Sequence, residues 1–119
     1  MATLFEKYGG FAKVSRIVSA FYDSVLDSPL LAPYFDGVDM RRIIDHQTKF
    51  IAQAMGGPAA YSNQELERVH RTLDVTDAAF DHMLTLLRET LEDFGVEEAD
   101  VDAVCSEILA RKPYIVIGH

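Results

Sequence analysis

The sequence has a single cysteine, Cys105, among its 119 residues. One thiol cannot form an internal disulfide bond, and we therefore expect a domain held together by an apolar core in the reducing cytoplasm. Basic residues are also few, since 11 Lys and Arg against 19 Asp and Glu give a net charge of −8. An acidic surface repels polyanions, which argues against nucleic acid or an anionic membrane as the partner.

Long apolar runs are absent as well. No uninterrupted apolar stretch approaches 18 residues, and residues 1–10 lack the pattern of a signal peptide, so we expect neither a membrane span nor a leader. The sequence also contains no phosphate-binding loop, nucleophile elbow, HExxH or CxxC motif. What the chain does have is 49% hydrophobic residues and a length that suits one domain over residues 1–119.

Apolar residues recur at helical spacing along most of the chain. This periodicity predicts long helices over residues 11–27, 39–55, 76–94 and 98–112, and short helices that start near residues 29 and 63. Asn63 and Thr76 are the expected N-caps of the two helices that they precede. Residues 114–119 form an apolar tail after Pro113, which either packs onto the body or mediates association. The sequence therefore predicts an all-α domain.

Three polar residues share the apolar faces of these helices, namely Tyr22, Gln47 and His70. Burying such groups without partners costs about 1–3 kcal/mol each, so something must satisfy them. His70 is either a core histidine with internal hydrogen bonds or a metal ligand, and the periodicity leaves both interpretations open. His46 lies on the flank of its helix, where a solvent-facing ring is the default. Arg68 belongs to a group of basic residues that are either solvated or meet the carboxylates of a ligand.

Several segments, in their order and spacing, resemble the group I truncated haemoglobins. They are TLFEKYGG (residues 3–10), FY (21–22) with VL (25–26), PYFDGVDM (33–40), HQTKF (46–50), MGG (55–57) and ERVHR (67–71). The resemblance covers nearly the whole chain. It implies a shortened globin fold, in which a two-over-two helical sandwich encloses haem.

The resemblance also implies a role for each matching residue. His70 matches the proximal iron ligand, and Tyr22 and Gln47 match the pair that hydrogen-bonds a diatomic ligand on the other haem face. The remaining matches line the haem: Phe35, Phe50 and the aliphatic Ile43. His46 stands where some members have a histidine that ligates iron as a sixth ligand, so bis-histidine ligation is a hypothesis for this chain.

Some family members attach haem covalently through a histidine of the last helix. Here residues 110–113 read ARKP, without histidine, and the terminal His119 is the nearby alternative. The resemblance therefore implies noncovalent haem b in a monomer or weak dimer.

The implied function is binding of oxygen, nitric oxide and carbon monoxide, with nitric oxide dioxygenation favoured over simple oxygen storage. This chemistry needs an external reductase, because the chain has neither room nor motif for a flavin or nicotinamide site. The alternative is a six-coordinate haem that serves as a redox or gas-sensing module without turnover, and a cofactor-free helical interaction domain is the third class.

Overall fold

This computed structural model describes residues 3–58, 61–70 and 75–116 of the chain. The regular secondary structure in these ranges is helical. No strand occurs in these ranges, and the all-α prediction is confirmed. In chain order the elements are α1 (Leu4–Lys7), α2 (Gly10–Leu26), η1 (Ala32–Phe35), α3 (Met40–Ala54), α4 (Asn63–His70), α5 (Asp77–Asp93), α6 (Glu98–Leu109) and η2 (Lys112–Tyr114).

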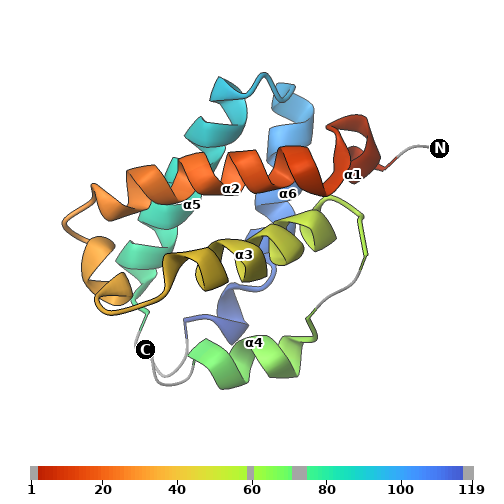
Figure 1. The fold of residues 1–119 in the computed structure, drawn as a ribbon. Coiled ribbons are helices and arrows are strands. Elements are labelled where there is room, and N and C mark those ends of the chain that lie inside the picture. The colour runs from red at the N-terminus through yellow and green to blue at the C-terminus, as the bar shows by residue number, and fades with distance from the viewer. Residues whose placement is uncertain (1–2, 59–60, 71–74, 117–119) are drawn as a thin grey trace.

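The four long helices form two layers. Helices α2 and α3 run side by side in front, and α5 and α6 cross behind them (Figure 1). Helix α2 contacts both α3 and α5, whereas α4 lies below the sandwich and contacts η2 near the C-terminus. This arrangement is the expected two-over-two sandwich, with α4 set apart from it.

The core lies between the two layers. Helix α2 contributes one continuous stripe of buried side chains: Val14, Ile17, Val18, Phe21, Tyr22 and Val25. From the other layer, α5 contributes Phe80, Leu87 and Leu91, each at most 3% exposed. Burial of one such apolar side chain stabilises the fold by about 1.5–3 kcal/mol.

The helix ends follow local chemistry. Thr76 caps α5 as predicted, because its hydroxyl oxygen accepts a hydrogen bond from the Ala79 backbone N–H at 3.1 Å. The predicted cap at Asn63 is wrong, since Asn63 is the first helical residue of α4. Ser62 caps this helix instead: its hydroxyl accepts from the Glu65 N–H, and the Glu65 carboxylate accepts from the Ser62 N–H. These two bonds form a capping box.

Two predicted boundaries also differ. The chain after Pro29 forms turns, and a short 3₁₀ helix, η1, follows only at Ala32. Helix α6 ends at Leu109 instead of Lys112, because the Pro113 ring would clash with the carbonyl four residues before it. Of the apolar tail, Ile115 is buried and packs onto the body, whereas residues 117–119, including His119, lie outside the described residues. Within the described ranges, none of the helices has the length and apolar character needed to cross a bilayer.

Candidate functional site

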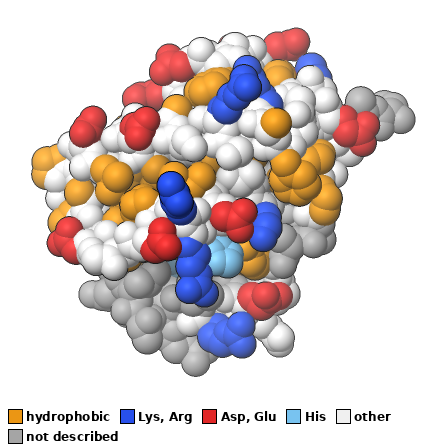
Figure 2. Space-filling model, in the orientation of Figure 1, with side chains coloured by type: hydrophobic (Ala, Val, Ile, Leu, Met, Phe, Trp, Pro, Cys, Tyr) orange, Lys and Arg blue, Asp and Glu red, His pale blue; other side chains and the backbone are white. Residues whose placement is uncertain are grey.

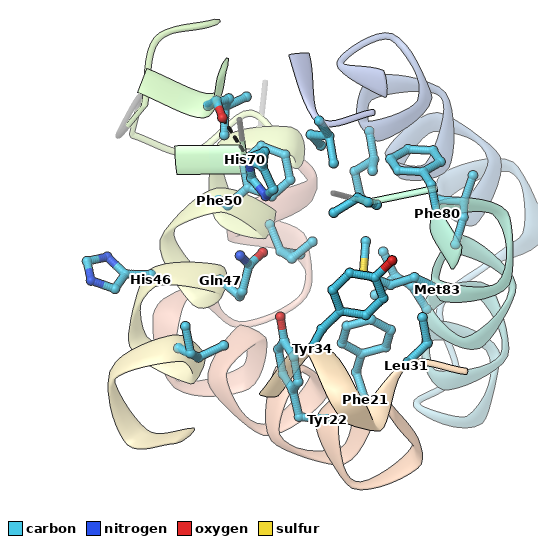
Figure 3. A pocket seen from close by; sticks show the side chains of 18 of the residues that line it. Phe21, Tyr22, Leu31, Tyr34, His46, Gln47, Phe50, His70, Phe80 and Met83 are labelled. Atoms are coloured by element: carbon cyan, nitrogen blue, oxygen red, sulfur yellow. Dashed lines mark hydrogen bonds between the residues drawn. The ribbon is translucent and has the colours of Figure 1, made fainter. Parts of the chain in front are cut away.

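A cavity of about 530 Å³ opens between the sandwich and α4. Its walls are mainly apolar and aromatic, with Phe21, Phe50, Phe80 and Met83 among the lining side chains (Figure 3). Ligand pockets in proteins span roughly 300–1,000 Å³ and are lined in this way, with a few placed polar groups. The cavity therefore has the size and character to bury one large apolar ligand.

His70 ends α4 at the edge of this cavity (Figure 3). Its Nδ1 lies 2.8 Å from the Leu66 carbonyl oxygen, and because a carbonyl can only accept, Nδ1 is the atom that carries the proton. Nε2 of the neutral ring then keeps its lone pair. Burial lowers the pKa of the imidazole below its usual value of 6.5, and the bond to Leu66 opposes this in part. The ring is thus neutral at pH 7 and its orientation is held, as a metal ligand requires.

Tyr22 and Gln47 reach the same cavity from α2 and α3. The Tyr22 side chain is only 3% exposed, and its hydroxyl points into the cavity toward the Gln47 amide (Figure 3). Within the described ranges, no hydrogen bond pairs either group with another residue. Burial raises the pKa of the Tyr22 phenol, so the hydroxyl stays protonated and able to donate. Two polar donors therefore face an otherwise apolar space.

The other residues singled out from the sequence line this cavity as well. Phe50 is buried, Ile43 and Phe35 are half-buried, and Arg68 is exposed. The Phe35 ring packs edge-on against Tyr22, with 5.4 Å between ring centroids, and thereby holds the tyrosine in place. Figure 2, drawn in the orientation of Figure 1, shows Lys and Arg side chains on the surface over α3 and α4. Of these helices' basic residues, Arg42 and Arg68 border the cavity.

His46 also belongs to the cavity wall, but its ring points away from the interior and from Gln47 (Figure 3). Its Nδ1 forms a hydrogen bond of 2.7 Å with the Tyr61 hydroxyl. This half-buried position agrees with the flank position expected from the helical spacing. Ligation of iron by His46 stays a prediction.

Two tyrosines of the site were not singled out from the sequence. Tyr34, in η1, reaches into the cavity on the side of Met83 (Figure 3). Its place in an aromatic corner next to Phe35 was a usable signal. Tyr61 lies in the segment before α4, where no periodicity applies, and only the folded chain brings it to His46.

The donor set fits haem better than a bare metal ion. Among the described residues, no three His, Cys, Asp or Glu side chains cluster in a way that could hold a metal. One imidazole at the edge of an apolar cavity instead suits a metal whose other ligands come with an organic macrocycle, as in haem proteins with a proximal histidine. The residues present therefore fit haem.

Comparison with known proteins agrees with this geometry. A family model described as bacterial-like globin matches residues 3–112. The chain belongs to this family. Among its relatives, the globin is 34% identical to the group 1 truncated hemoglobin of Synechocystis sp., an alignment that covers 87% of this chain and 90% of the relative. The identity to the group 1 truncated hemoglobin of Nostoc sp. is 28%, over 98% of both chains.

Solved structures place the fold of this globin in the same group. The truncated hemoglobin from Tetrahymena pyriformis in the Fe(III) form superposes with a TM-score of 0.86, at 26% identity, over 99% of this chain and 100% of that one. The 2/2 hemoglobin from Synechococcus sp. PCC 7002, in the cyanomet state with covalently attached heme, gives 0.88 at 28% identity over 97% and 98% of the chains. The identification as a truncated haemoglobin is confirmed, and membership implies haem-based gas binding.

With His70 as the iron ligand, which is the assignment proposed below, the haem affinity of this globin is expected to hold down to pH 6.5 and to fall only below it. A metal ligand must be deprotonated, and burial keeps His70 neutral at a pH where an exposed histidine is half protonated. Below the lowered pKa, proton competition weakens affinity by up to about tenfold per pH unit. Hemin titrations between pH 8 and 5, with circular dichroism to follow helix content, measure this. Loss centred at or above pH 6.5 with intact helices would contradict it.

Proposed function

We propose that this globin binds haem b noncovalently through His70, binds oxygen on the opposite side, and converts nitric oxide to nitrate. The observation that carries the proposal is the pairing of two features of one apolar cavity. On one side His70 has a held, neutral ring with Nε2 available, and on the other Tyr22 and Gln47 present donors. This arrangement would be unfavourable in a filled apolar core, because the polar groups of Tyr22 and Gln47 and the Nε2 atom of His70 would have no hydrogen-bond partners there.

The chain holds the cofactor with three kinds of side chain. His70 ligates the iron, and the aromatic and aliphatic walls around Phe35, Phe50 and Ile43 bury the apolar ring. Arg42 and Arg68, which border the cavity and form no ion pair with any residue in the described ranges, meet the carboxylates of the cofactor. When bound, haem iron supplies the coordination position for a diatomic gas and the capacity to change oxidation state by one electron.

Tyr22 and Gln47 determine how a gas is retained. Their hydroxyl and amide groups donate hydrogen bonds to a polarised diatomic molecule, and each bond contributes on the order of 1–3 kcal/mol in a dry pocket. The apolar remainder of the cavity limits the access of water. Strong donors in a dry pocket favour retention of oxygen over carbon monoxide, because oxygen becomes the more polar of the two when bound.

The residues between α6 and η2 are the basis for proposing that haem is attached noncovalently. The Synechococcus relative carries covalently attached heme. In this globin the end of α6 and the turn after it present Leu109, Ala110, Arg111, Lys112 and Pro113, none of which has a nucleophilic imidazole. Extraction of the haem by acidified butanone is therefore expected to leave a colourless polypeptide.

Nitric oxide dioxygenation requires an electron donor. The reaction combines one nitric oxide, one oxygen and one electron into one nitrate ion. We propose that an external reductase supplies the electron, since residues 1–119 contain no phosphate-binding loop or glycine-rich dinucleotide motif for a flavin or nicotinamide. We also propose that the protein is located in the cytoplasm, where such reductases act.

A six-coordinate haem module for redox or gas sensing is the second candidate. The observation that favours it is the presence of a second imidazole, His46, in the wall of the same cavity. In that case His70 and His46 would both hold the haem iron, and a gas would have to compete with His46 for it.

One experiment tests the proposed function and separates it from the second candidate. Absorption spectra of the hemin-reconstituted protein are recorded in the ferrous state before and after carbon monoxide. A five-coordinate spectrum that shifts on carbon monoxide addition, together with nitrate formed one for one from nitric oxide in the presence of oxygen, supports the proposal. A colourless protein overturns it, and six-coordinate iron with no nitrate formation selects the redox or sensing module.

A further inference from the structure

Tyr61 is fixed in place by its backbone. Its N–H donates to Gln53 Oε1 at 2.9 Å, and its carbonyl oxygen accepts from Gln53 Nε2 at 3.1 Å. One glutamine of α3 therefore binds both backbone groups of Tyr61, as a neighbouring strand would. This paired contact attaches the segment before α4 to the side of α3.

His46 lies on the same side of α3 as Gln53. The two residues are seven positions apart, which is close to two helical turns, so their side chains leave the helix in nearly the same direction. The Tyr61 side chain extends from its backbone contact with Gln53 toward His46, and its hydroxyl lies 2.7 Å from His46 Nδ1. Tyr61 is thus bound at its backbone by one residue of α3 and at its hydroxyl by another.

No second hydrogen bond to a described residue holds the His46 ring. Its charged neighbours on α3, Asp45 and Lys49, pair with each other at 3.1 Å. The Tyr61 contact therefore accounts for the direction of the ring, which points away from the cavity although His46 belongs to the cavity wall. Rotation about the side-chain bonds of His46 is what separates this position from one inside the cavity.

We propose that Tyr61 is a positioning residue that holds His46 out of the cavity and so keeps the space beside Tyr22 and Gln47 open to gas. The inference rests on the proposed function, because an open space matters only if a gas binds there. Tyr61 acts on haem chemistry through His46 alone. Loss of its hydroxyl lets the imidazole turn inward, where it competes with the gas for the iron.

The variant Tyr61→Phe tests this directly. It removes the hydroxyl but keeps the ring, and the bonds to Gln53 survive because they involve only the backbone. Since a hydrogen bond of this kind changes an equilibrium by roughly twofold to tenfold, the ratio of six-coordinate to five-coordinate iron is expected to rise by that factor. The absorption spectra of the ferric and ferrous protein report this ratio. The double variant with His46→Ala is expected to return to five-coordinate iron.

Two further measurements decide the remaining cases. Tyr8→Phe, which removes a tyrosine hydroxyl bonded to Asp100 far from the cavity, is the matched control and is expected to leave the ratio unchanged. Nuclear magnetic resonance of the haem-free protein is expected to show new contacts between the His46 ring and Ile43 or Tyr22 in Tyr61→Phe. This readout stands even if haem binding, and with it the proposed function, fails.

The proposal is overturned by any of three results. The first is a wild-type protein already fully six-coordinate through His46, since Tyr61 then holds nothing open. The second is an unchanged coordination ratio in Tyr61→Phe, and the third is a haem-free His46 ring whose contacts are the same with and without the Tyr61 hydroxyl.

Discussion

Replacing His70 by alanine is expected to abolish the Soret band of the reconstituted protein and to weaken hemin binding on the order of a hundredfold or more. Loss of an outer partner of a metal ligand already costs about tenfold to a hundredfold in affinity, and His70 is the proposed ligand itself. Its Nδ1–H bond to the Leu66 carbonyl holds the ring, and burial keeps it neutral. Hemin titration followed at the Soret band measures the effect.

A matched control separates ligation from general damage. His82, on α5, pairs with the Ser28 hydroxyl at 3.1 Å and is not part of the cavity wall, so His82→Ala is expected to leave hemin affinity within about twofold. In His70→Gly, added imidazole is expected to restore the band, because the free ring can occupy the space of the missing side chain. Undiminished hemin affinity in His70→Ala would refute the assignment of the iron ligand.

The Tyr22→Phe variant is expected to release oxygen roughly tenfold to a hundredfold faster. The Tyr22 side chain is buried and its hydroxyl is protonated and directed into the cavity, and a hydrogen bond worth about 1–3 kcal/mol to a polar ligand corresponds to this range of rates. Phenylalanine keeps the edge-on contacts with Phe21 and Phe35. The fold is therefore expected to keep its stability, so the kinetic effect belongs to the hydroxyl.

Stopped-flow measurement of oxygen dissociation tests this expectation. Carbon monoxide release serves as the internal comparison, since the less polar ligand gains little from a donor and its rate is expected to change by less than about threefold. Tyr34→Phe is the matched variant, because its hydroxyl enters the same cavity on the side of Met83 rather than beside Gln47. Equal oxygen release rates in wild type and Tyr22→Phe would remove Tyr22 from the distal role.

Some details of the fold were readable from short stretches of sequence. Thr76 caps α5 and Pro113 limits α6 because both effects act within one helical turn. The capping box of Ser62 and Glu65 follows the same local rule. The prediction of Asn63 as the N-cap of α4 is wrong because Ser and Asn are both good capping residues and they stand next to each other here. Local chemistry of this kind needs no knowledge of the rest of the chain.

The hollow centre of the molecule was not readable in this way. Periodicity shows that Tyr22, Gln47 and His70 face inward, but it assigns the same direction to a residue in a packed core and to one that lines a cavity. Only the arrangement of α4 below the two layers leaves about 530 Å³ between them. The resemblance to truncated haemoglobins predicts this cavity, whereas the helical periodicity does not.

By itself, the sequence determined which segments are helical, which side of each helix faces inward and which family the chain resembles. These properties depend on the order of residues along one helix or one motif. The tertiary structure decided that His46 turns outward, because the direction of that ring depends on a hydroxyl 15 residues away in the chain. Tyr61 lies beside His46 because the Gln53 side chain binds the Tyr61 backbone. Contacts of this kind, between segments that share no periodicity, arise only when the chain has folded.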